Sequence, residues 1–390
     1  MPSQTIHAAR SRSDPSRISL RDDGREADGE APRPRARALI LSALVGYGHH
    51  ASALALQEEL AQAAPELTVV VRDGLDGGGW SRLYLERLLR RQMLSFPRSY
   101  SWSFALLRMP GTRQLAMRLA EQASSRQLSA LIAAERPSVI VSTYPAVTAV
   151  LGAMRRRGAL EIPVCSLITD VAGLHFWAHP GIDLHIACYE ESLGEIAAIS
   201  AGAPARQVSP PVARAHRHGR ARSACLEQLG LAADRPLVVV SGGGWGVGDL
   251  DGAVRVVLSR DDVQVAVACG HNDRLRRRLQ ARYAGDVRVR VLGFTELMPE
   301  LLGGASALVH STGGVTCLEA AVHGCPVIAY GFGHGHLREN LRTMRGSGLL
   351  VHARNRAELC LRLGEVLEAE HGEREVAELP SASSQILELV

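Results

Sequence analysis

The 390-residue chain contains 46% hydrophobic residues, which suffices for two or three domains with substantial cores. A formal net charge of +4 is too small for a dedicated nucleic-acid-binding protein, so we expect no nucleic acid as a partner. The seven cysteines form no CxxC and no paired Cys/His spacing, which indicates buried thiols in a reducing compartment and predicts neither disulfides nor a metal site.

The first 36 residues differ from the rest in composition. Residues 1–36 are rich in Arg, Ser, Asp and Pro and lack an apolar stretch, which predicts a disordered leader and not a signal peptide. No run of about 18 apolar residues occurs in the sequence. We therefore expect a cytoplasmic protein that is soluble or peripheral at a membrane.

Strands and helices are predicted to alternate over residues 37–208. The apolar run at 36–44 predicts a buried strand, a glycine turn follows at 46–48, and leucines at helical spacing predict a helix over 50–64. Further strands are predicted at 68–71, 138–142 and 164–168, with helices between them. This order predicts a parallel sheet covered on both faces.

A linker and a second alternating block are predicted after residue 208. Residues 209–222 are rich in His and Arg and short of large apolar side chains, as is typical of a linker. A second domain is predicted over 223–370, followed by a tail at 371–390 with helical potential. Two doubly wound domains would face a central cleft, where ligands bind beyond the carboxyl ends of the strands. The strands expected in the second domain are 236–240, 263–268, 287–292, 307–310 and 326–330.

The first glycine turn precedes a histidine. Glycines let the chain turn tightly and expose amides at a helix N-terminus, which favours negative charge. His49 lies where a general base would lie, at the carboxyl edge of the first strand. The alternative is a histidine that only caps the helix, and the spacing does not separate the two interpretations.

The second glycine turn contains five glycines among residues 242–248. Such a loop after a strand can bind a diphosphate through its backbone amides. It resembles a dinucleotide fingerprint, but the next strand ends at 268–273 without an acid at its tip. A nicotinamide or flavin enzyme is therefore disfavoured, and we expect no cofactor.

The third turn is the most specific pattern. A predicted strand ends at His310, Gly313 and Gly314 turn the chain, and Thr316 and Glu319 lie on one face of the helix that follows. A carboxylate at this position can accept hydrogen bonds from both hydroxyls of a ribose. The alternative is an ordinary first-turn acid favoured by the helix dipole.

Taken together, these motifs resemble a glycosyltransferase family. The family contains the bacterial peptidoglycan N-acetylglucosaminyltransferase, monogalactosyldiacylglycerol synthase and the diacylglycerol glucosyltransferases, and the similarity covers roughly residues 37–370. The matching stretches are GYGHHASA (46–53), ITDVAGLHFWAHPGID (168–183), VSGGGWGVG (240–248), LGF (292–294) and VHSTGGVTCLEAAVHG (309–324).

The resemblance implies a GT-B fold. It also implies the inverting transfer of a hexose from a UDP-sugar to a hydroxyl of a lipid such as diacylglycerol. The family needs no nicotinamide, no flavin and no tightly held structural metal. By the same resemblance, His49 and Asp170 are candidate catalytic residues. The donor site would bind uracil through the backbone of Phe294 and ribose through Glu319. Its diphosphate would lie on Gly243, Gly244, Gly313, Gly314 and Thr316. The acceptor site would be formed by Gly46, Tyr47, Gly48, His175 and Trp177.

The sequence departs from the family in two places. Tyr47 stands where the family usually has a run of glycines, which narrows the loop. The family's Gln- or acid-rich sugar-binding motif is replaced by residues 333–340, of which Glu339 and Asn340 remain candidates for the sugar hydroxyls. The identity of the sugar stays open.

Residues 82–118 combine Arg with Leu, Phe and Trp in amphipathic segments, which suits the anionic inner face of a cell membrane. The alternative is a solvated helix face with ordinary core packing. Three other functions stay open at this stage: transfer to a soluble or natural-product acceptor, UDP-sugar epimerisation or hydrolysis, and an inactive nucleotide-sugar-binding protein.

Overall fold

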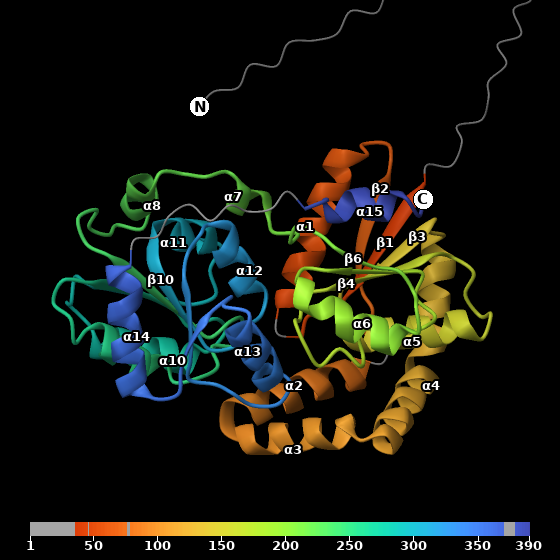
Figure 1. Cartoon of the computed structure of the whole chain (residues 1–390), viewed down its shortest axis with the longest axis horizontal. Helices are drawn as coiled ribbons and strands as arrows, with labels where there is room; N and C mark the ends of the chain where they lie inside the picture. The colour runs from red at the N-terminus through yellow and green to blue at the C-terminus, as the bar shows by residue number, and fades with distance from the viewer. Residues whose placement is uncertain (1–35, 46, 76–78, 370–378) are drawn as a thin grey trace, which may run out of the picture. The chain divides into compact units, whose positions relative to one another are not determined.

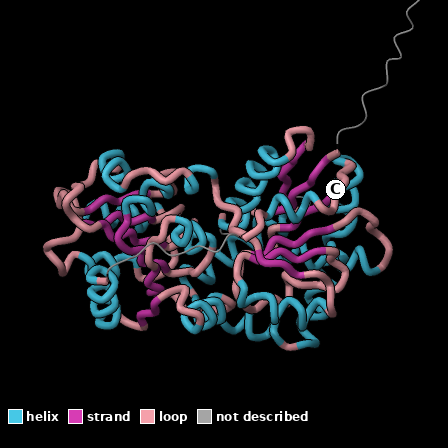
Figure 2. Tube along the Cα trace, turned by 45° about the horizontal axis from the view of Figure 1, so that its top comes forward, coloured by secondary structure: helices cyan, strands magenta, loops and turns pink. Residues whose placement is uncertain are grey.

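The computed structural model of the protein describes residues 36–45, 47–75, 79–369 and 379–390. The predicted leader, apart from Ala36, and the predicted acceptor residue Gly46 lie outside the described residues. The described chain contains two separate parallel sheets, each flanked by helices (Figures 1 and 2).

The first sheet defines the N-terminal domain. Within the described residues it has six strands in the order β2-β1-β3-β4-β5-β6, and all neighbours are parallel. The strands are β1 (Arg37–Ser42), β2 (Thr68–Asp73), β3 (Val139–Ser142), β4 (Val164–Ile168), β5 (Leu184–Ala187) and β6 (Ala205–Gln207).

The helices of this domain often begin at a proline. Proline occupies the first position of α3, α4 and α5, where its missing N–H costs no hydrogen bond and its fixed φ suits a helix. The helices are α1 (Gly48–Ala63), α2 (Gly79–Ser95), α3 (Pro97–Arg108), α4 (Pro110–Glu135), α5 (Pro145–Arg156), the 3-10 helix η1 (Glu190–Ser192) and α6 (Leu193–Ser200).

The second sheet defines the C-terminal domain, with the strand order β12-β11-β10-β7-β8-β9, again parallel throughout. Its strands are β7 (Leu237–Ser241), β8 (Gln264–Ala268), β9 (Val289–Leu292), β10 (Ala305–His310), β11 (Val327–Tyr330) and β12 (Val351–Ala353). The helices are α7 (Arg214–Arg217), α8 (Arg222–Gln228), α9 (Leu250–Val257), α10 (Asp273–Arg282), α11 (Met298–Gly304), α12 (Val315–Val322), α13 (Leu337–Gly346) and α14 (Arg356–Glu368).

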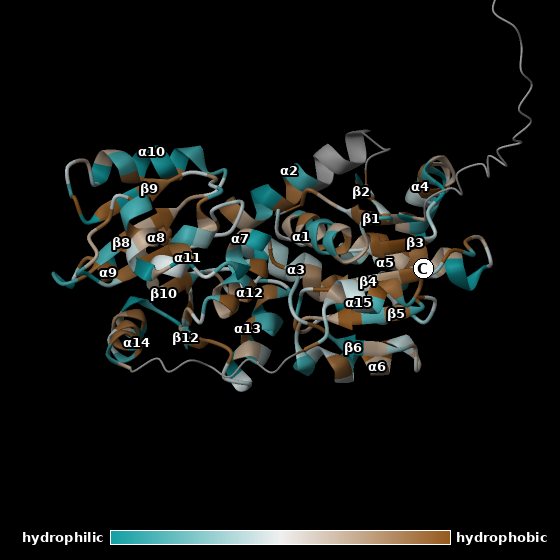
Figure 3. Cartoon of the chain, turned by 90° about the horizontal axis from the view of Figure 1, so that it is seen from above, coloured by the Kyte–Doolittle hydropathy of each residue, from teal (hydrophilic) through white to brown (hydrophobic). Residues whose placement is uncertain are grey.

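The predicted fold class, two doubly wound α/β domains, is confirmed. Every residue of the central strands β3, β4, β7 and β8 is buried, as expected for parallel strands covered on both faces. Hydrophobic residues accordingly gather along the strands, whereas α10, with its five arginines, is mainly hydrophilic (Figure 3).

Strands β5, β6 and β12 were not predicted, and each has only three or four residues. β5 carries a buried histidine, and β6 reads Ala-Arg-Gln. Runs this short and this polar give little periodicity for a sequence-based prediction.

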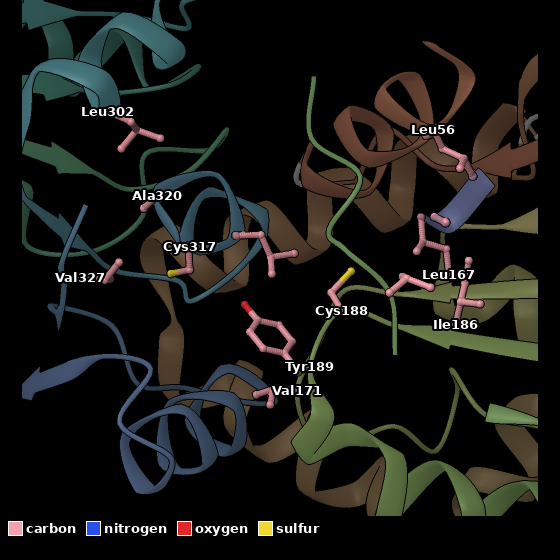
Figure 4. Packing of buried hydrophobic residues seen from close by; sticks show 14 of the residues in the cluster. Leu56, Leu167, Val171, Ile186, Cys188, Tyr189, Leu302, Cys317, Ala320 and Val327 are labelled. Atoms are coloured by element: carbon pink, nitrogen blue, oxygen red, sulfur yellow. The ribbon is translucent and has the colours of Figure 1, made fainter. Parts of the chain in front are cut away.

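Buried apolar side chains connect the two domains. One core cluster includes Val171, Cys188 and Tyr189 from the N-terminal domain together with Cys317 and Ala320 from the C-terminal domain (Figure 4). The domains therefore share part of their hydrophobic core.

The helix α15 (Ala382–Leu387) returns to the N-terminal domain, where it contacts α1 (Figure 1). The backbone N–H of Ser383 donates to Glu59 Oε1 over 2.8 Å, and that of Ser209 donates to the carbonyl of Pro380 over 2.9 Å. The predicted tail at 371–390 thus contains a helix among its described residues.

Across the described part of the chain, no helix combines the length and the apolar character needed to cross a bilayer.

Candidate active site at the domain interface

Loops that follow strands of one domain contact loops that follow strands of the other. Tyr47, after β1, packs its ring against His271, after β8, and Phe294, after β9, at centroid distances of 4.5 and 5.1 Å. His271 and Phe294 stack on each other at 4.3 Å. The carboxyl ends of the two sheets, where ligands bind in such folds, therefore meet here.

Tyr47 has an unusual backbone. Its φ of 68° lies in the left-handed region, where a side chain costs roughly 1–2 kcal/mol. This position was predicted to narrow the loop. Tyr47 also packs against a buried cluster that includes Trp245 and Phe332 of the C-terminal domain. The strained backbone therefore occurs where the residue gains contacts across the interface.

His49 lies in the first turn of α1 with its ring half-buried. The ring packs edge-on against Tyr144 and Trp177 at centroid distances of 5.3 and 5.4 Å. Its Nδ1 is buried and has no hydrogen-bond partner among the described residues. Burial lowers the pKa of His49, with a further lowering from His336 and an opposing rise from Asp170, so the imidazole is neutral at pH 7.

Asp170 follows β4, and both of its carboxylate oxygens are engaged. Oδ2 accepts a 2.8 Å hydrogen bond from the indole N–H of Trp177, and Oδ1 accepts one of 2.8 Å from the side-chain amide of Asn340. The amide oxygen of Asn340 accepts a 3.0 Å hydrogen bond from the backbone N–H of Ala172. Asn340, expected at the donor sugar, is fully buried against the N-terminal domain.

The glycine loop after β7 is tightly wound. Gly243, Gly246 and Gly248 have positive φ angles of 65°, 61° and 106°. A side chain on Gly242 would come within 2.5 Å of the carbonyl oxygen of Val247, so the turn requires glycine there. The carbonyl of Gly244 is taken by the N–H of His271 at 2.8 Å.

The glycine loop after β10 lies directly beside it. A methyl group on Gly243 would lie 3.3 Å from Thr312 Oγ1, so the two loops that were predicted to bind the diphosphate are neighbours. Gly313 has a φ of 62°, and Gly314 precedes α12 without a side-chain cap. No side chain of the preceding residue therefore caps the first N–H groups of α12. N–H groups at such a helix start can bind an anion.

Glu319 lies on α12 with its side chain 14% exposed. Burial raises its pKa to about 7, and a hydrogen bond with Thr316 opposes that rise. The predicted donor residues Thr316 and Glu319 are thus brought together.

A histidine that was not predicted to form part of the site approaches Glu319 and contacts a second histidine. His216 Nε2 lies 3.6 Å from Glu319 Oε1, and His216 Nδ1 lies 3.0 Å from His323 Nε2. Burial lowers the pKa of His216 to about 4, so this ring is neutral beside the acid. His216 comes from α7, inside the predicted linker.

Glu339 and His175 lie at another part of the interface. Glu339 forms an ion pair with Arg108 at the end of α3, and a methyl group on Gly173 would lie 3.0 Å from Glu339 Oε2. Burial and the charge of Arg113 lower the pKa of His175. These side chains meet near the start of α13 and not beside Glu319.

Helix α3 contacts the loop after β11. Tyr100 Oη and His336 Nδ1 are 2.5 Å apart, and Ser101 Oγ lies 3.0 Å from His334 Nδ1. The backbone N–H of Gly335 donates to Ser101 Oγ over 3.2 Å. One face of the segment that was predicted to bind a membrane is thus packed on the C-terminal domain.

Both halves of the chain match glycosyltransferase family models. Residues 49–210 match the model of monogalactosyldiacylglycerol (MGDG) synthase, and residues 245–369 match that of glycosyl transferases group 1. Together the two matches fit the GT-B glycosyltransferase family that includes glycolipid synthases. The family resemblance seen in the sequence is confirmed.

Two curated relatives of this chain are named processive diacylglycerol beta-glucosyltransferases. The protein of Bacillus licheniformis is 27% identical over 237 residues, which covers 58% of this chain and 60% of that protein. The protein of Bacillus cytotoxicus is 25% identical over 239 residues, which covers 60% of this chain and 61% of that protein. The chain thus spans less than two thirds of the length of these relatives.

Solved structures share the fold at low identity. The spinosyn rhamnosyltransferase SpnG complexed with thymidine diphosphate has a TM-score of 0.56 and 14% identity, over 91% of this chain and 99% of that chain. A Medicago truncatula protein complexed with UDP-glucose has a TM-score of 0.56 and 12% identity, over 91% and 93% of the two chains. At these identities the likeness extends to the fold alone.

Sequence reasoning missed several residues at the domain interface of this protein. His216 approaches Glu319, and His271 packs on Tyr47. Tyr100 and His336 lie close to each other across the interface, and His336 lowers the pKa of His49. The His-rich composition of the linker was the one available signal for His216. Nothing in the local sequence indicates the contacts of the other three.

Proposed function

We propose that the protein is an inverting glycosyltransferase that moves a hexose from a UDP-sugar to a hydroxyl of a lipid acceptor such as diacylglycerol. One observation carries this proposal. The first turn of α1, which holds the neutral His49, contacts the first turn of α12, where a methyl group on Gly48 would lie 3.4 Å from Val315 Cγ2. The residue proposed as the base and the helix start proposed to bind the diphosphate would therefore lie next to each other.

The donor would bind to the C-terminal domain. Its diphosphate would accept hydrogen bonds from the loops around Gly243, Gly244 and Gly313, and from amides at the start of α12, which has no side-chain cap. The ribose would lie on Glu319 and the uracil along the backbone of Phe294. The wound turns at Gly243 and Gly313 support this arrangement, because glycines with positive φ angles form these turns and carry no side chain that would separate a diphosphate from the backbone.

The acceptor would react at the N-terminal domain. Its oxygen forms a bond to the anomeric carbon while the bond from that carbon to the diphosphate oxygen breaks. The acceptor proton moves to His49, and the electron pair of the broken bond leaves with UDP. A neutral imidazole is the form that can take this proton, which the lowered pKa of His49 supports.

Fixed amides would stabilise the charge that grows on the departing diphosphate. Such groups need no reorganisation during the reaction, which is the usual source of a large part of the rate. Gly313, Gly314 and Thr316 are the candidates for this role. No step of this scheme requires a nicotinamide or a flavin.

Exposed apolar side chains on α3 and α4, and at the residues that flank α3, support binding to a membrane surface. Trp102 is 80% exposed and Leu106 is 54% exposed, both on α3. Arg98 and Arg118 are exposed on the same segment. Apolar and basic side chains together suit an anionic bilayer. Four more exposed apolar side chains complete this surface: Phe96, Met109, Leu115 and Leu119.

The proposal is tested by UDP release from UDP-glucose and UDP-galactose, with and without diacylglycerol in anionic vesicles. Release that depends on the lipid is the expected result. Release without lipid would indicate a hydrolase, and release with a soluble alcohol alone would indicate a soluble acceptor. UDP binding without release under any condition would indicate an inactive sensor.

A further inference from the structure

A hydrogen-bonded group from both domains lies beside His49. We name Asp170, Trp177 and Asn340 the interdomain bridge. We infer that Asn340 is a positioning residue for His49 and acts across the domain interface through Asp170 and Trp177. This inference rests on the proposed function, because it assumes that His49 takes the acceptor proton.

The contacts of Asn340 require an amide. Its nitrogen donates to Asp170 Oδ1 over 2.8 Å, while its oxygen accepts from the N–H of Ala172 over 3.0 Å. An aspartate could accept from Ala172 but could not donate to Asp170. The side chain is fully buried, so water cannot replace a lost bond without a structural change.

The bond to Asn340 completes the coordination of the Asp170 carboxylate. Its other oxygen accepts the 2.8 Å hydrogen bond from the indole of Trp177. A carboxylate that accepts from two fixed donors, one in each domain, has a defined orientation. If Asn340 is removed, Asp170 keeps only the partner in its own domain.

Trp177 transmits this orientation to His49. The indole is 2% exposed, and its ring meets the imidazole edge-on at 5.4 Å and 61°. Tyr144 packs against the same imidazole at 5.3 Å. Trp177 and Tyr144 thus restrict the ring of His49, and the position of Trp177 depends on Asp170.

Asp170 also acts on His49 through its charge. The carboxylate favours the protonated imidazole, while burial and His336 oppose it. A displaced Asp170 would therefore leave His49 a weaker base as well as a less well oriented one. Asn340 belongs to α13 of the C-terminal domain, whereas His49 and Asp170 belong to the N-terminal domain. Asn340 can therefore orient His49 only while the two domains are packed together as in this structure.

The test compares Asn340→Ala, Asn340→Asp and the control Asn355→Ala. Asn355 lies in the same domain, where it caps α14 by accepting from the N–H of Glu358 over 3.0 Å. We expect the Ala variant to lower kcat about 10- to 100-fold, as small misplacements of reacting groups do, with UDP affinity unchanged. The control should keep the kcat of the natural protein.

The order of the two Asn340 variants separates positioning from packing. The Asp variant fills the same space but puts a second carboxylate against Asp170, so we expect it to be slower than the Ala variant. A packing role predicts the reverse, because only Ala leaves a cavity. The Asp variant also preserves the test if the Ala variant does not fold.

A second readout does not depend on activity. With ¹⁵N-labelled tryptophan, the indole N–H resonance of Trp177, assigned through Trp177→Phe, should shift in both Asn340 variants and stay in place in Asn355→Ala. If no sugar transfer is found but this resonance shifts, the proposed function fails while the bridge stands. An unchanged resonance, an unchanged kcat, or a kcat loss matched by lost UDP affinity would each overturn the inference.

Discussion

Gly48 of the N-terminal domain and Val315 of the C-terminal domain lie in contact, with 3.4 Å between the Val315 Cγ2 atom and the position that a methyl group on Gly48 would occupy. Each residue belongs to the first turn of its helix, α1 or α12. The N-termini of α1 and α12 therefore lie close together at the interface. The partial positive charges of both helix ends can favour the binding of a single anion between them. The proposed site for the departing diphosphate follows from this relationship.

Glu319→Ala should weaken UDP binding by about 1.5–3 kcal/mol, because hydrogen bonds from the ribose hydroxyls to a charged acceptor are lost. Calorimetric titration with UDP measures this. Glu365→Ala, which removes an exposed acid from α14, is the matched control and should bind UDP as the natural protein does. Equal affinities in the two variants would remove Glu319 from the donor site.

The affinity for UDP should also depend on pH through Glu319. Burial raises the pKa of this group to about 7, and only the carboxylate can accept from both ribose hydroxyls. We therefore expect affinity to weaken as pH falls from 8 to 6. Glu319→Gln should lack this dependence, and a variant that retains it would assign the effect to another group.

Glu319 should also make the free energy of unfolding depend on pH, but in the opposite direction to the affinity for UDP. A carboxyl whose pKa is raised in the folded state stabilises that state below its unfolded pKa of about 4.5, and this contribution is lost as pH rises towards 7. Glu319→Gln should thus raise the free energy of unfolding at pH 8 by on the order of 2 kcal/mol. Denaturant titrations at pH 4 and pH 8 measure the difference, which should nearly vanish at pH 4, below the unfolded pKa.

His49→Ala should reduce turnover by about 10²–10⁴-fold while UDP affinity changes little, as expected for a general base. His50→Ala is the neighbouring control and should be tolerated. Because the pKa of His49 is lowered, activity of the natural protein should fall only as pH drops below 6.5. Greater damage from His50→Ala, or loss of UDP binding in His49→Ala, would show that this loop has another role.

Binding to anionic vesicles should depend on α3. Trp102→Ala removes the most exposed aromatic side chain of this segment, and Arg98→Gln removes a charge that is worth about 1 kcal/mol near such a surface. Co-sedimentation should fall in both variants and with added salt. Leu361→Ala, which removes a 67% exposed leucine from α14, should leave it unchanged. Absence of binding by the natural protein at low salt would favour a soluble acceptor.

Much of the fold was predictable because long apolar strands and glycine turns are local signals. The run Leu237–Ser241 and the turn that follows it are recognisable without any tertiary information. Strand β6, with three residues at the edge of its sheet, offers no such pattern. Helix α15 is short as well, and its contact with α1 depends on a residue more than 300 positions away.

The candidate site was predictable only in part. The turns around Gly243 and Gly313 were found because glycine spacing reflects backbone geometry directly. The hydrogen bond between Asn340 and Asp170 could not be predicted, because Asn340 lies 170 residues further along the chain and reaches Asp170 only when the domains meet. His216 was likewise assigned to a linker, because its approach to Glu319 is a property of the folded chain alone.

The stereochemistry of the product distinguishes inverting transfer to a lipid from the other proposed reactions. Purified protein is incubated with the α-linked UDP-sugar that supports lipid-dependent UDP release and with diacylglycerol in anionic vesicles, and the anomeric proton of the product is recorded by NMR. Inverting transfer predicts a β-linked glycolipid that forms in step with UDP. A product that retains the α configuration would contradict the single-displacement scheme, and free sugar or an epimerised UDP-sugar without glycolipid would contradict the proposed transferase activity itself.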